Sequence, residues 1–149
     1  MKTKLSLLFQ LVLTSGVFAA GAVVDLPRGT IEGADFAKAQ ELATTEKKNI
    51  AYIYTDKATT CPLCEGASNE FIKSVRSKSV FVYLDSKAAS TYWGKLPAPV
   101  RDTIAKSKII PIMVVTSADG KTVLSSINYE TYAKDTKASL RDFKKPLKD

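Results

Sequence analysis

The sequence predicts an α/β fold: a mixed sheet of four or five strands with helices on both faces. Short, almost continuous apolar segments alternate with segments of helical periodicity along most of the chain. Strands separated by helices favour parallel neighbours in the sheet. Asp119-Gly120 lies between two strand-like segments, which predicts a hairpin and therefore an antiparallel edge.

The first 22 residues have the pattern of a secretory signal peptide. Lys2 and Lys4 precede an apolar stretch at residues 5–18, and small residues follow at 19–22. We expect cleavage near 19–22 and a periplasmic or secreted protein; an uncleaved N-terminal anchor is the alternative. Residues 23–149 are then predicted to form a single domain, a length that suits one hydrophobic core.

The composition is that of an ordinary globular protein, with 45% hydrophobic and 25% charged residues. The formal net charge is +7, and without Lys2 and Lys4 it is about +5. The basic residues are scattered and form no motif with aromatic residues, so we expect no nucleic-acid partner.

The first half of the chain predicts two helix–strand units after a short opening strand. The opening strand covers residues 23–26 and ends where Pro27 and Gly29 break it. Apolar residues at spacings of three and four then predict a helix over 35–48 with Asp35 as its N-cap. The later segments are a strand at 50–55, a polar turn at 56–60, a helix that starts at Cys61-Pro62, and a strand at 80–84.

The second half of the chain predicts a short helix, two strands joined by a hairpin turn, and a final helix. Within 86–108, Val100 and Ile104 predict a short helix that begins near Pro99. Residues 109–116 predict a buried strand that contains Pro111, and the turn at 118–121 leads into a strand at 122–127. Asn128 is expected to cap one last helix, whose apolar face holds Tyr129, Tyr132, Ala133, Leu140 and Phe143.

Cys61 and Cys64 are the two cysteines of the chain and lie where a strand passes into a helix. The peptide N–H groups at a helix N-terminus carry partial positive charge, which favours the thiolate, the nucleophilic form of cysteine. Pro62 suits the first helical position, where no N–H is needed. We therefore expect Cys61 to be the attacking thiol and Cys64 the resolving thiol of disulfide exchange, with no metal or organic cofactor.

A cysteine pair with this spacing can also bind zinc, attach haem or form an inert structural bridge. Structural zinc needs four ligands, and the chain has two cysteines and no histidine. Haem attachment needs a histidine after the second cysteine, where Glu65 stands. An inert structural disulfide remains the alternative. Closing so short a loop, however, adds little stability to the protein.

Cys61-Pro62-Leu63-Cys64, Ile110-Pro111 before a strand, and Asp119-Gly120-Lys121 before the next strand resemble the thioredoxin superfamily over about residues 35–143. The resemblance implies a thioredoxin-like fold with a cis Ile110–Pro111 bond beside the cysteines. The Ile110 backbone would there pair with an incoming peptide. The chain departs from cytoplasmic thioredoxins at Thr60, where they have tryptophan. Their buried acid falls near Thr55 or Asp56.

Charged residues around the motif are candidates for tuning it. Asp56 is either a proton acceptor for Cys64 or, as we prefer, a turn residue. Lys57 and Glu65 flank the cysteines and would act in opposite directions, or are simply solvated.

The sequence thus predicts an exported thiol–disulfide oxidoreductase acting on protein thiols and disulfides, supplied in a bacterial periplasm by a membrane electron donor. The alternative is a thioredoxin-like module that binds peptides or a partner and carries an inert disulfide. A peroxidase is disfavoured because its characteristic cysteine motif is missing. The direction of electron flow and the oligomeric state stay open.

Overall fold

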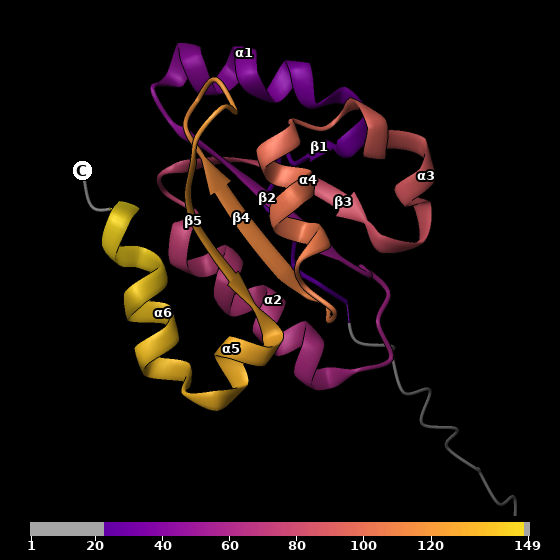
Figure 1. The fold of residues 1–149 in the computed structure, drawn as a ribbon, viewed down its shortest axis with the longest axis vertical. Helices are drawn as coiled ribbons and strands as arrows, with labels where there is room; N and C mark the ends of the chain where they lie inside the picture. Colours follow the sequence, from indigo (N-terminus) through magenta and orange to yellow (C-terminus); the bar gives the residue numbers. More distant parts are fainter. Residues whose placement is uncertain (1–22, 148–149) are drawn as a thin grey trace, which may run out of the picture.

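The computed structural model describes residues 23–147, so the predicted signal peptide lies outside the described residues. The strands form one sheet in the order β1-β3-β2-β4-β5. They are β1 (Ile31–Glu32), β2 (Asn49–Thr55), β3 (Ser79–Asp85), β4 (Ile112–Thr116) and β5 (Val123–Asn128). The helices are α1 (Phe36–Glu46), α2 (Pro62–Val75), α3 (Ala89–Tyr92), α4 (Ala98–Ala105), α5 (Tyr129–Lys134) and α6 (Thr136–Lys144). The mixed α/β sheet is as predicted (Figure 1).

The direction of β4 differs from the expectation that strands separated by helices lie parallel. β1, β3 and β2 are parallel, whereas β4 is antiparallel to both β2 and β5. In the register, Tyr54 near the end of β2 lies opposite Ile112 at the start of β4. The connection from β3 to β4 therefore begins and ends at the same end of the sheet, and a strand that starts there must run back.

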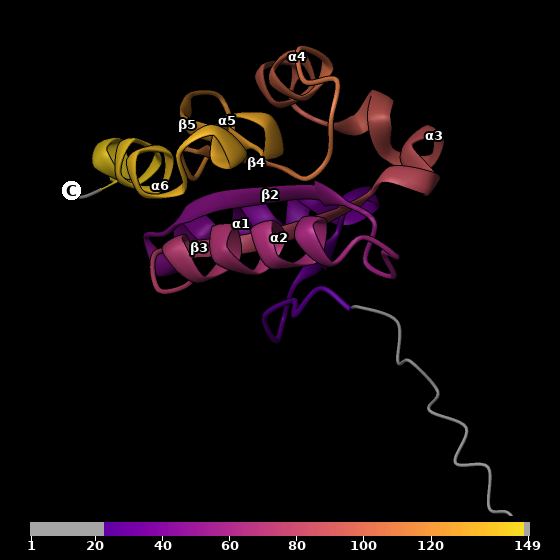
Figure 2. The same ribbon diagram turned by 90° about the horizontal axis from the view of Figure 1, so that it is seen from below.

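Two separate hydrophobic clusters lie on the two faces of the sheet. One joins Phe71 and Ile72 of α2 and Phe143 of α6 to alternate residues of the strands. The other joins Ala39 and Ala43 of α1 and Val100 and Ile104 of α4 to the intervening strand residues. In Figure 1, α1, α3 and α4 occupy the upper part of the molecule and α2, α5 and α6 the lower part; Figure 2 shows the same arrangement from below. Helices thus cover both faces, as predicted.

Two strand predictions were wrong at their prolines. Residues 23–26 form no strand, although Val24 is buried and its N–H donates to the Lys57 carbonyl (3.1 Å). The edge strand forms after the Pro27 turn, at β1. β4 begins at Ile112 rather than at residue 109, because Pro111 has no N–H for the ladder.

The predicted last helix is divided into α5 and α6. Asn128 caps α5 as expected, and its side chain accepts the Thr131 N–H (2.9 Å). Asp135 is extended, with φ −154° and ψ 98°, and its carboxylate accepts the Ala138 N–H (2.9 Å). Aspartate competes with the helix backbone for hydrogen bonds and favours a cap over a helix interior. The chain therefore turns at Asp135 and starts a new helix.

Candidate active site

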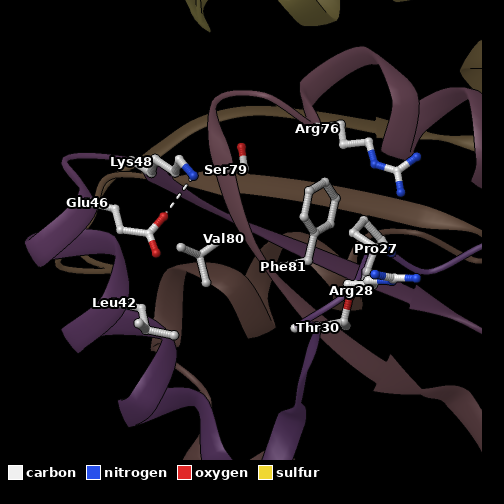
Figure 3. A pocket seen from close by; sticks show the side chains of 11 residues that line it. Pro27, Arg28, Thr30, Leu42, Glu46, Lys48, Arg76, Ser79, Val80 and Phe81 are labelled. Carbon is white, nitrogen blue, oxygen red and sulfur yellow. Dashed lines mark hydrogen bonds and ion pairs between the residues drawn. The ribbon is translucent and has the colours of Figure 1, made fainter.

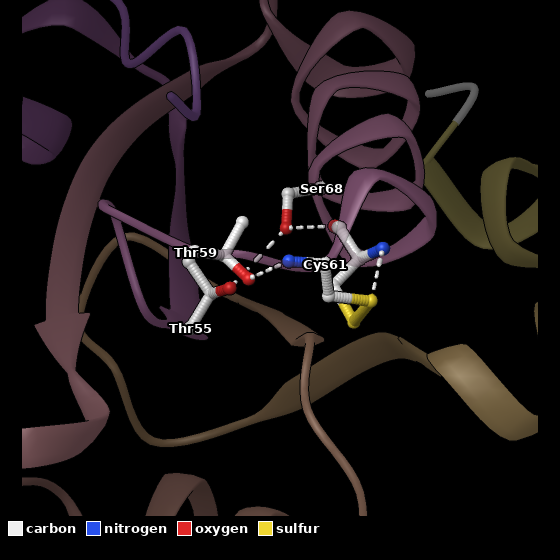
Figure 4. Close-up of a disulfide and its surroundings, with 5 residues drawn as sticks. Thr55, Thr59, Cys61 and Ser68 are labelled. Atoms are coloured by element: carbon white, nitrogen blue, oxygen red, sulfur yellow. Dashed lines mark hydrogen bonds between the residues drawn. A yellow bond between two sulfur atoms is a disulfide. The ribbon is translucent and has the colours of Figure 1, made fainter. Parts of the chain in front are cut away.

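Cys61 and Cys64 form a disulfide at the N-terminus of α2, with their Cα atoms 5.3 Å apart (Figure 4). Cys61 is the N-cap residue, with extended backbone, and Pro62 is the first residue of the helix. The Cys64 N–H donates to Cys61 Sγ (3.2 Å). The sequence expectation that a strand, a turn and Pro62 place Cys61 at a helix start is confirmed, because a proline costs no hydrogen bond at that position.

The pair is open to solvent on one side. Both cysteines are half-buried, while Pro62 is exposed and Leu63 is 69% exposed. A disulfide in this position is reachable by a partner chain without any movement of the core.

Three buried hydroxyl groups hold the other side of the motif. Thr59 Oγ1 accepts the Cys61 N–H (3.0 Å). Ser68 Oγ donates to the Cys64 carbonyl (2.8 Å) and lies 3.3 Å from Thr55 Oγ1. Figure 4 shows these side chains between the end of β2 and the first turns of α2. Thr59 and Ser68 thus hold the backbones of the two cysteines through uncharged groups, and Thr55 bonds to Ser68.

Sequence reasoning missed Thr59 and Ser68. Two local signals could have found them. Thr59 precedes Cys61 by two residues, the spacing at which a threonine hydroxyl accepts a backbone N–H in a turn. Ser68 follows Cys64 by four residues, the spacing at which a helical serine donates back to a carbonyl.

Ile110 and Pro111 lie at the same end of the sheet as the disulfide. Tyr54 pairs with Ile112, so Pro111 comes level with Thr55, the last residue of β2. The Ile110–Pro111 peptide bond is cis, as the family resemblance implies. Pro111 is buried, and its carbonyl accepts the Tyr129 N–H (2.9 Å), whereas Ile110 is half-buried and Ile109 is exposed.

The three charged candidates are placed differently from one another. Asp56 makes an ion pair with Lys87 (2.6 Å) and accepts the Ala58 N–H (3.2 Å), which is a turn residue's arrangement. The hydrogen bond from Lys87 to Asp56 raises the pKa of that lysine. Thr55, and not an acid, is therefore the buried residue at the end of β2.

Lys57 and Glu65 both make hydrogen bonds through their backbone N–H groups. The Lys57 N–H donates to the Tyr83 hydroxyl (3.0 Å), and its side chain is exposed. The Glu65 N–H donates to the Cys61 carbonyl (3.1 Å), and its side chain is half-buried in the first turn of α2. In the described part of the chain, no three acidic, histidine or cysteine side chains come together in a way that could hold a metal ion.

Comparison with solved structures finds a similar fold. The crystal structure of a disulphide isomerase from Xylella fastidiosa Temecula1 superposes with a TM-score of 0.55 and is 16% identical, covering 85% of this chain and 98% of that one. A DsbH oxidoreductase gives a TM-score of 0.45 at 17% identity, covering 89% of this chain and 95% of that one. No protein-family model and no curated protein sequence matches the chain.

At 16% identity, the similarity to the Xylella isomerase indicates a shared fold only. The DsbH superposition is too distant to be used as evidence. The sheet order, the covering helices and the first superposition agree with one another. The chain therefore has a thioredoxin-like fold that carries a Cys-x-x-Cys disulfide at the start of its α2 helix.

Proposed function

We propose that this protein is an exported thiol–disulfide oxidoreductase that exchanges disulfides with protein substrates through Cys61 and Cys64. The observation that carries the proposal is the solvent-accessible disulfide at the N-terminus of α2. The bridge closes a loop of a few residues, so it adds little to stability, and its position suits reactivity better than structural support.

The helix start favours Cys61 as the nucleophile. Its sulfur already accepts the Cys64 N–H at the end of the helix that carries partial positive charge. Negative charge on Cys61 Sγ is stabilised there once the bridge is reduced. The Cys64 backbone is held on its other side by Ser68, which supports its role as the resolving thiol.

The exchange then takes two balanced steps. The Cys61 thiolate attacks one sulfur of a substrate disulfide, forms a mixed disulfide and releases the other substrate sulfur as a thiolate. The Cys64 thiolate next attacks Cys61 Sγ, which closes the Cys61–Cys64 bridge and releases the second substrate thiol. The substrate gains two electrons and the enzyme loses them; the reverse sequence oxidises a substrate dithiol.

We propose that the substrate peptide binds against Ile110 and Pro111. Among residues 23–147, neither the N–H nor the C=O of Ile110 has a hydrogen-bond partner, so both are free to pair with an extended chain. The exposed Leu63 and Ile109 side chains offer apolar contact near this segment and the cysteines.

Cysteine variants test the exchange directly. Cys64→Ser, mixed with a disulfide-containing protein substrate, should accumulate a mixed disulfide that mass spectrometry maps to Cys61. Cys61→Ser should exchange no disulfides, while the Ser74→Ala control on the same helix should behave as wild type. Normal turnover by Cys61→Ser would refute the proposal.

The direction of exchange follows from the reduction potential of the pair, measured by equilibration with glutathione. A value of about −270 mV indicates a reductase supplied by another protein, such as a membrane electron donor, and one of about −120 mV indicates an oxidant. A bridge that stays closed under strongly reducing conditions, with undiminished partner binding by the double cysteine variant, would instead favour the peptide-binding module.

Export is tested separately. The charge, the apolar stretch and the small residues of the first 22 positions support cleavage near 19–22. N-terminal sequencing of the protein from the periplasm or culture medium should give a start in that range. An intact N-terminus in the membrane fraction would show an anchor instead. Within residues 23–147, no helix is both long and apolar enough to cross a membrane.

A further inference from the structure

The N-terminal part of β3 has an open edge. β2 pairs with β3 along its whole length, from Ser79 to Asp85, whereas β1 pairs only with Val82 and Tyr83 on the other side. The chain before β1 turns away at Pro27, whose carbonyl accepts both the N–H and the hydroxyl of Thr30 (3.2 and 2.6 Å). The edge beside Ser79–Phe81 is therefore left without a neighbouring strand in the described part of the chain.

The backbone groups that face this edge follow from the register. The Lys78 carbonyl accepts the Asn49 N–H (3.0 Å), so it points toward β2. Successive residues of a strand direct their N–H and C=O groups to alternate sides. Ser79 and Phe81 therefore point to the open edge. In a parallel pair, one residue of an added strand could donate its N–H to the Ser79 carbonyl and accept the Phe81 N–H with its own carbonyl.

A cavity of about 520 Å³ lies over the open edge. Its walls come from three separate parts of the chain: the Pro27–Thr30 turn, the end of α1, and the segment from Arg76 to Phe81 (Figure 3). Phe81 belongs to the core cluster on one face of the sheet and Val80 to the cluster on the other. The cavity thus gives apolar contact to alternate side chains of an extended peptide, which point to opposite faces.

The charge of the cavity selects among extended peptides. Arg28 and Arg76 line it, and Figure 3 shows both guanidinium groups to the same side of the Phe81 ring. Neither arginine forms an ion pair with any residue of 23–147. Glu46 is the carboxylate of the lining, and it is neutralised by Lys48 (2.7 Å). The charged residues of the lining therefore sum to a net positive charge. Guanidinium groups bind carboxylates in a paired geometry.

We propose that the open edge of β3 binds an extended acidic segment of a partner protein by strand addition. Backbone pairing with Ser79 and Phe81 provides the affinity, and Arg28 and Arg76 select acidic side chains. A second copy of this chain fits less well, because edge-to-edge pairing would bring the arginines of both copies together.

This site is separate from the disulfide. Ser79 lies beside Asn49 at the start of β2, whereas Cys61 follows the end of that strand. The seven residues of β2 span roughly 20 Å. A protein substrate can therefore occupy both places at once, and the proposal stands or falls independently of the exchange chemistry.

The test uses amide NMR of the oxidised protein titrated with the peptide acetyl-Val-Glu-Val-Glu-Val-amide. The Phe81 amide should shift on binding, and its hydrogen exchange should slow at least tenfold in the complex. Arg28→Gln and Arg76→Gln should each weaken binding severalfold, and Arg76→Lys should recover part of the loss. Lys38→Gln and Lys73→Gln, on the same two helices that flank the cavity but outside its lining, should have no effect.

Two further probes separate strand addition from simple anion binding. A version of the peptide with N-methylated backbone keeps both carboxylates but cannot pair as a strand, so it should not bind. Inorganic phosphate should not displace the peptide at equal concentration. Equal binding of the N-methylated peptide, displacement by phosphate, or no binding of the acidic peptide overturns the proposal. So does a dimer of the free protein that Arg28→Gln stabilises. The peptide probes need no protein variant, so a variant that fails to fold leaves the test intact.

Discussion

On the buried side of the cysteine motif, the Thr55 hydroxyl group donates a hydrogen bond to Ser68. The distance from Thr55 Oγ1 to Ser68 Oγ is 3.3 Å. The direction follows from the second bond of Ser68, whose single hydroxyl hydrogen is given to the Cys64 carbonyl (2.8 Å). Both side chains are buried. The end of β2 is thus tied to the backbone of the cysteine motif by uncharged groups, in the region where the family resemblance implies an acid.

Removal of the two hydroxyls should have unequal effects on stability. Ser68→Ala breaks both bonds and leaves the Thr55 hydroxyl buried without a partner, which should cost about 1–3 kcal/mol of unfolding free energy. Thr55→Val breaks one bond and leaves the donation to Cys64 in place, so about 1 kcal/mol is expected. Urea denaturation of the oxidised proteins measures both values.

The double variant should cost less than the sum of the single variants, by about 0.5–1 kcal/mol. Ser74→Ala is the control: within residues 23–147 its hydroxyl makes a similar bond to the Phe71 carbonyl (2.7 Å) on the same helix and no hydrogen bond to a second side chain. Strict additivity of Thr55→Val and Ser68→Ala would contradict the coupling.

Gly33 and Gly66 should respond in opposite directions to alanine. A Cβ at Gly33 would meet Leu84 Cδ2 at 2.6 Å and the Tyr83 carbonyl at 3.3 Å, in a buried position against β3. Gly33→Ala should cost about 1–3 kcal/mol by overpacking. Gly66 lies within α2 with nothing within 4 Å of an added Cβ, so Gly66→Ala should add about 0.5–1 kcal/mol. Thermal unfolding of both variants checks the pair, and similar shifts in Tm would disprove the packing argument.

Tyr52 should make the protein sensitive to alkali. Burial raises the pKa of Tyr52 from 10.0 to about 12, against a smaller opposing effect of Thr116. The folded state therefore holds the proton more tightly than the unfolded chain does. This contribution is fully present below pH 10 and is lost as the pH rises through 10 to 12, by about 3 kcal/mol in all.

Unfolding free energy measured by urea between pH 8 and 12 tests this. Tyr52→Phe should remove part of the decline over that interval, since phenylalanine has no proton to lose. Burial also raises the pKa of Tyr83 and Tyr92, so these two tyrosines should keep the remainder of the decline in the variant. Tyr129→Phe, which changes a tyrosine outside the strands, is the control and should leave the decline in place. An unchanged alkaline profile in Tyr52→Phe would show that other groups govern it.

The cap at Asn128 should contribute measurably to stability. Its side chain accepts the Thr131 N–H (2.9 Å) at the start of α5. Asn128→Ala should cost about 1 kcal/mol, while Asn128→Asp keeps the acceptor and should be close to wild type. Guanidinium denaturation measures both, and equal losses for alanine and aspartate would mean that the amide, not the capping oxygen, matters.

Much of the local structure could be predicted from residues close together in the chain. Apolar spacing defined α1 and α2, Pro62 placed the start of α2 at the cysteines, and Asn128 marked the start of α5. Each of these depends on hydrogen bonds and packing within one or two turns, where residue type alone sets the preference. The errors arose where two local preferences compete, as at Asp135, which suits a helix cap as well as a helix surface.

The tertiary structure alone decided which distant residues meet. The antiparallel direction of β4, the ion pair of Asp56 with Lys87, the Thr55–Ser68 pair and the open edge of β3 all join segments separated by turns or whole helices. The secondary-structure preference of single residues does not predict such contacts, because they follow from the packing of both helical layers onto one sheet. The sequence by itself determined a Cys-x-x-Cys at a helix start; the fold determined that buried, uncharged hydroxyl groups hold its backbone.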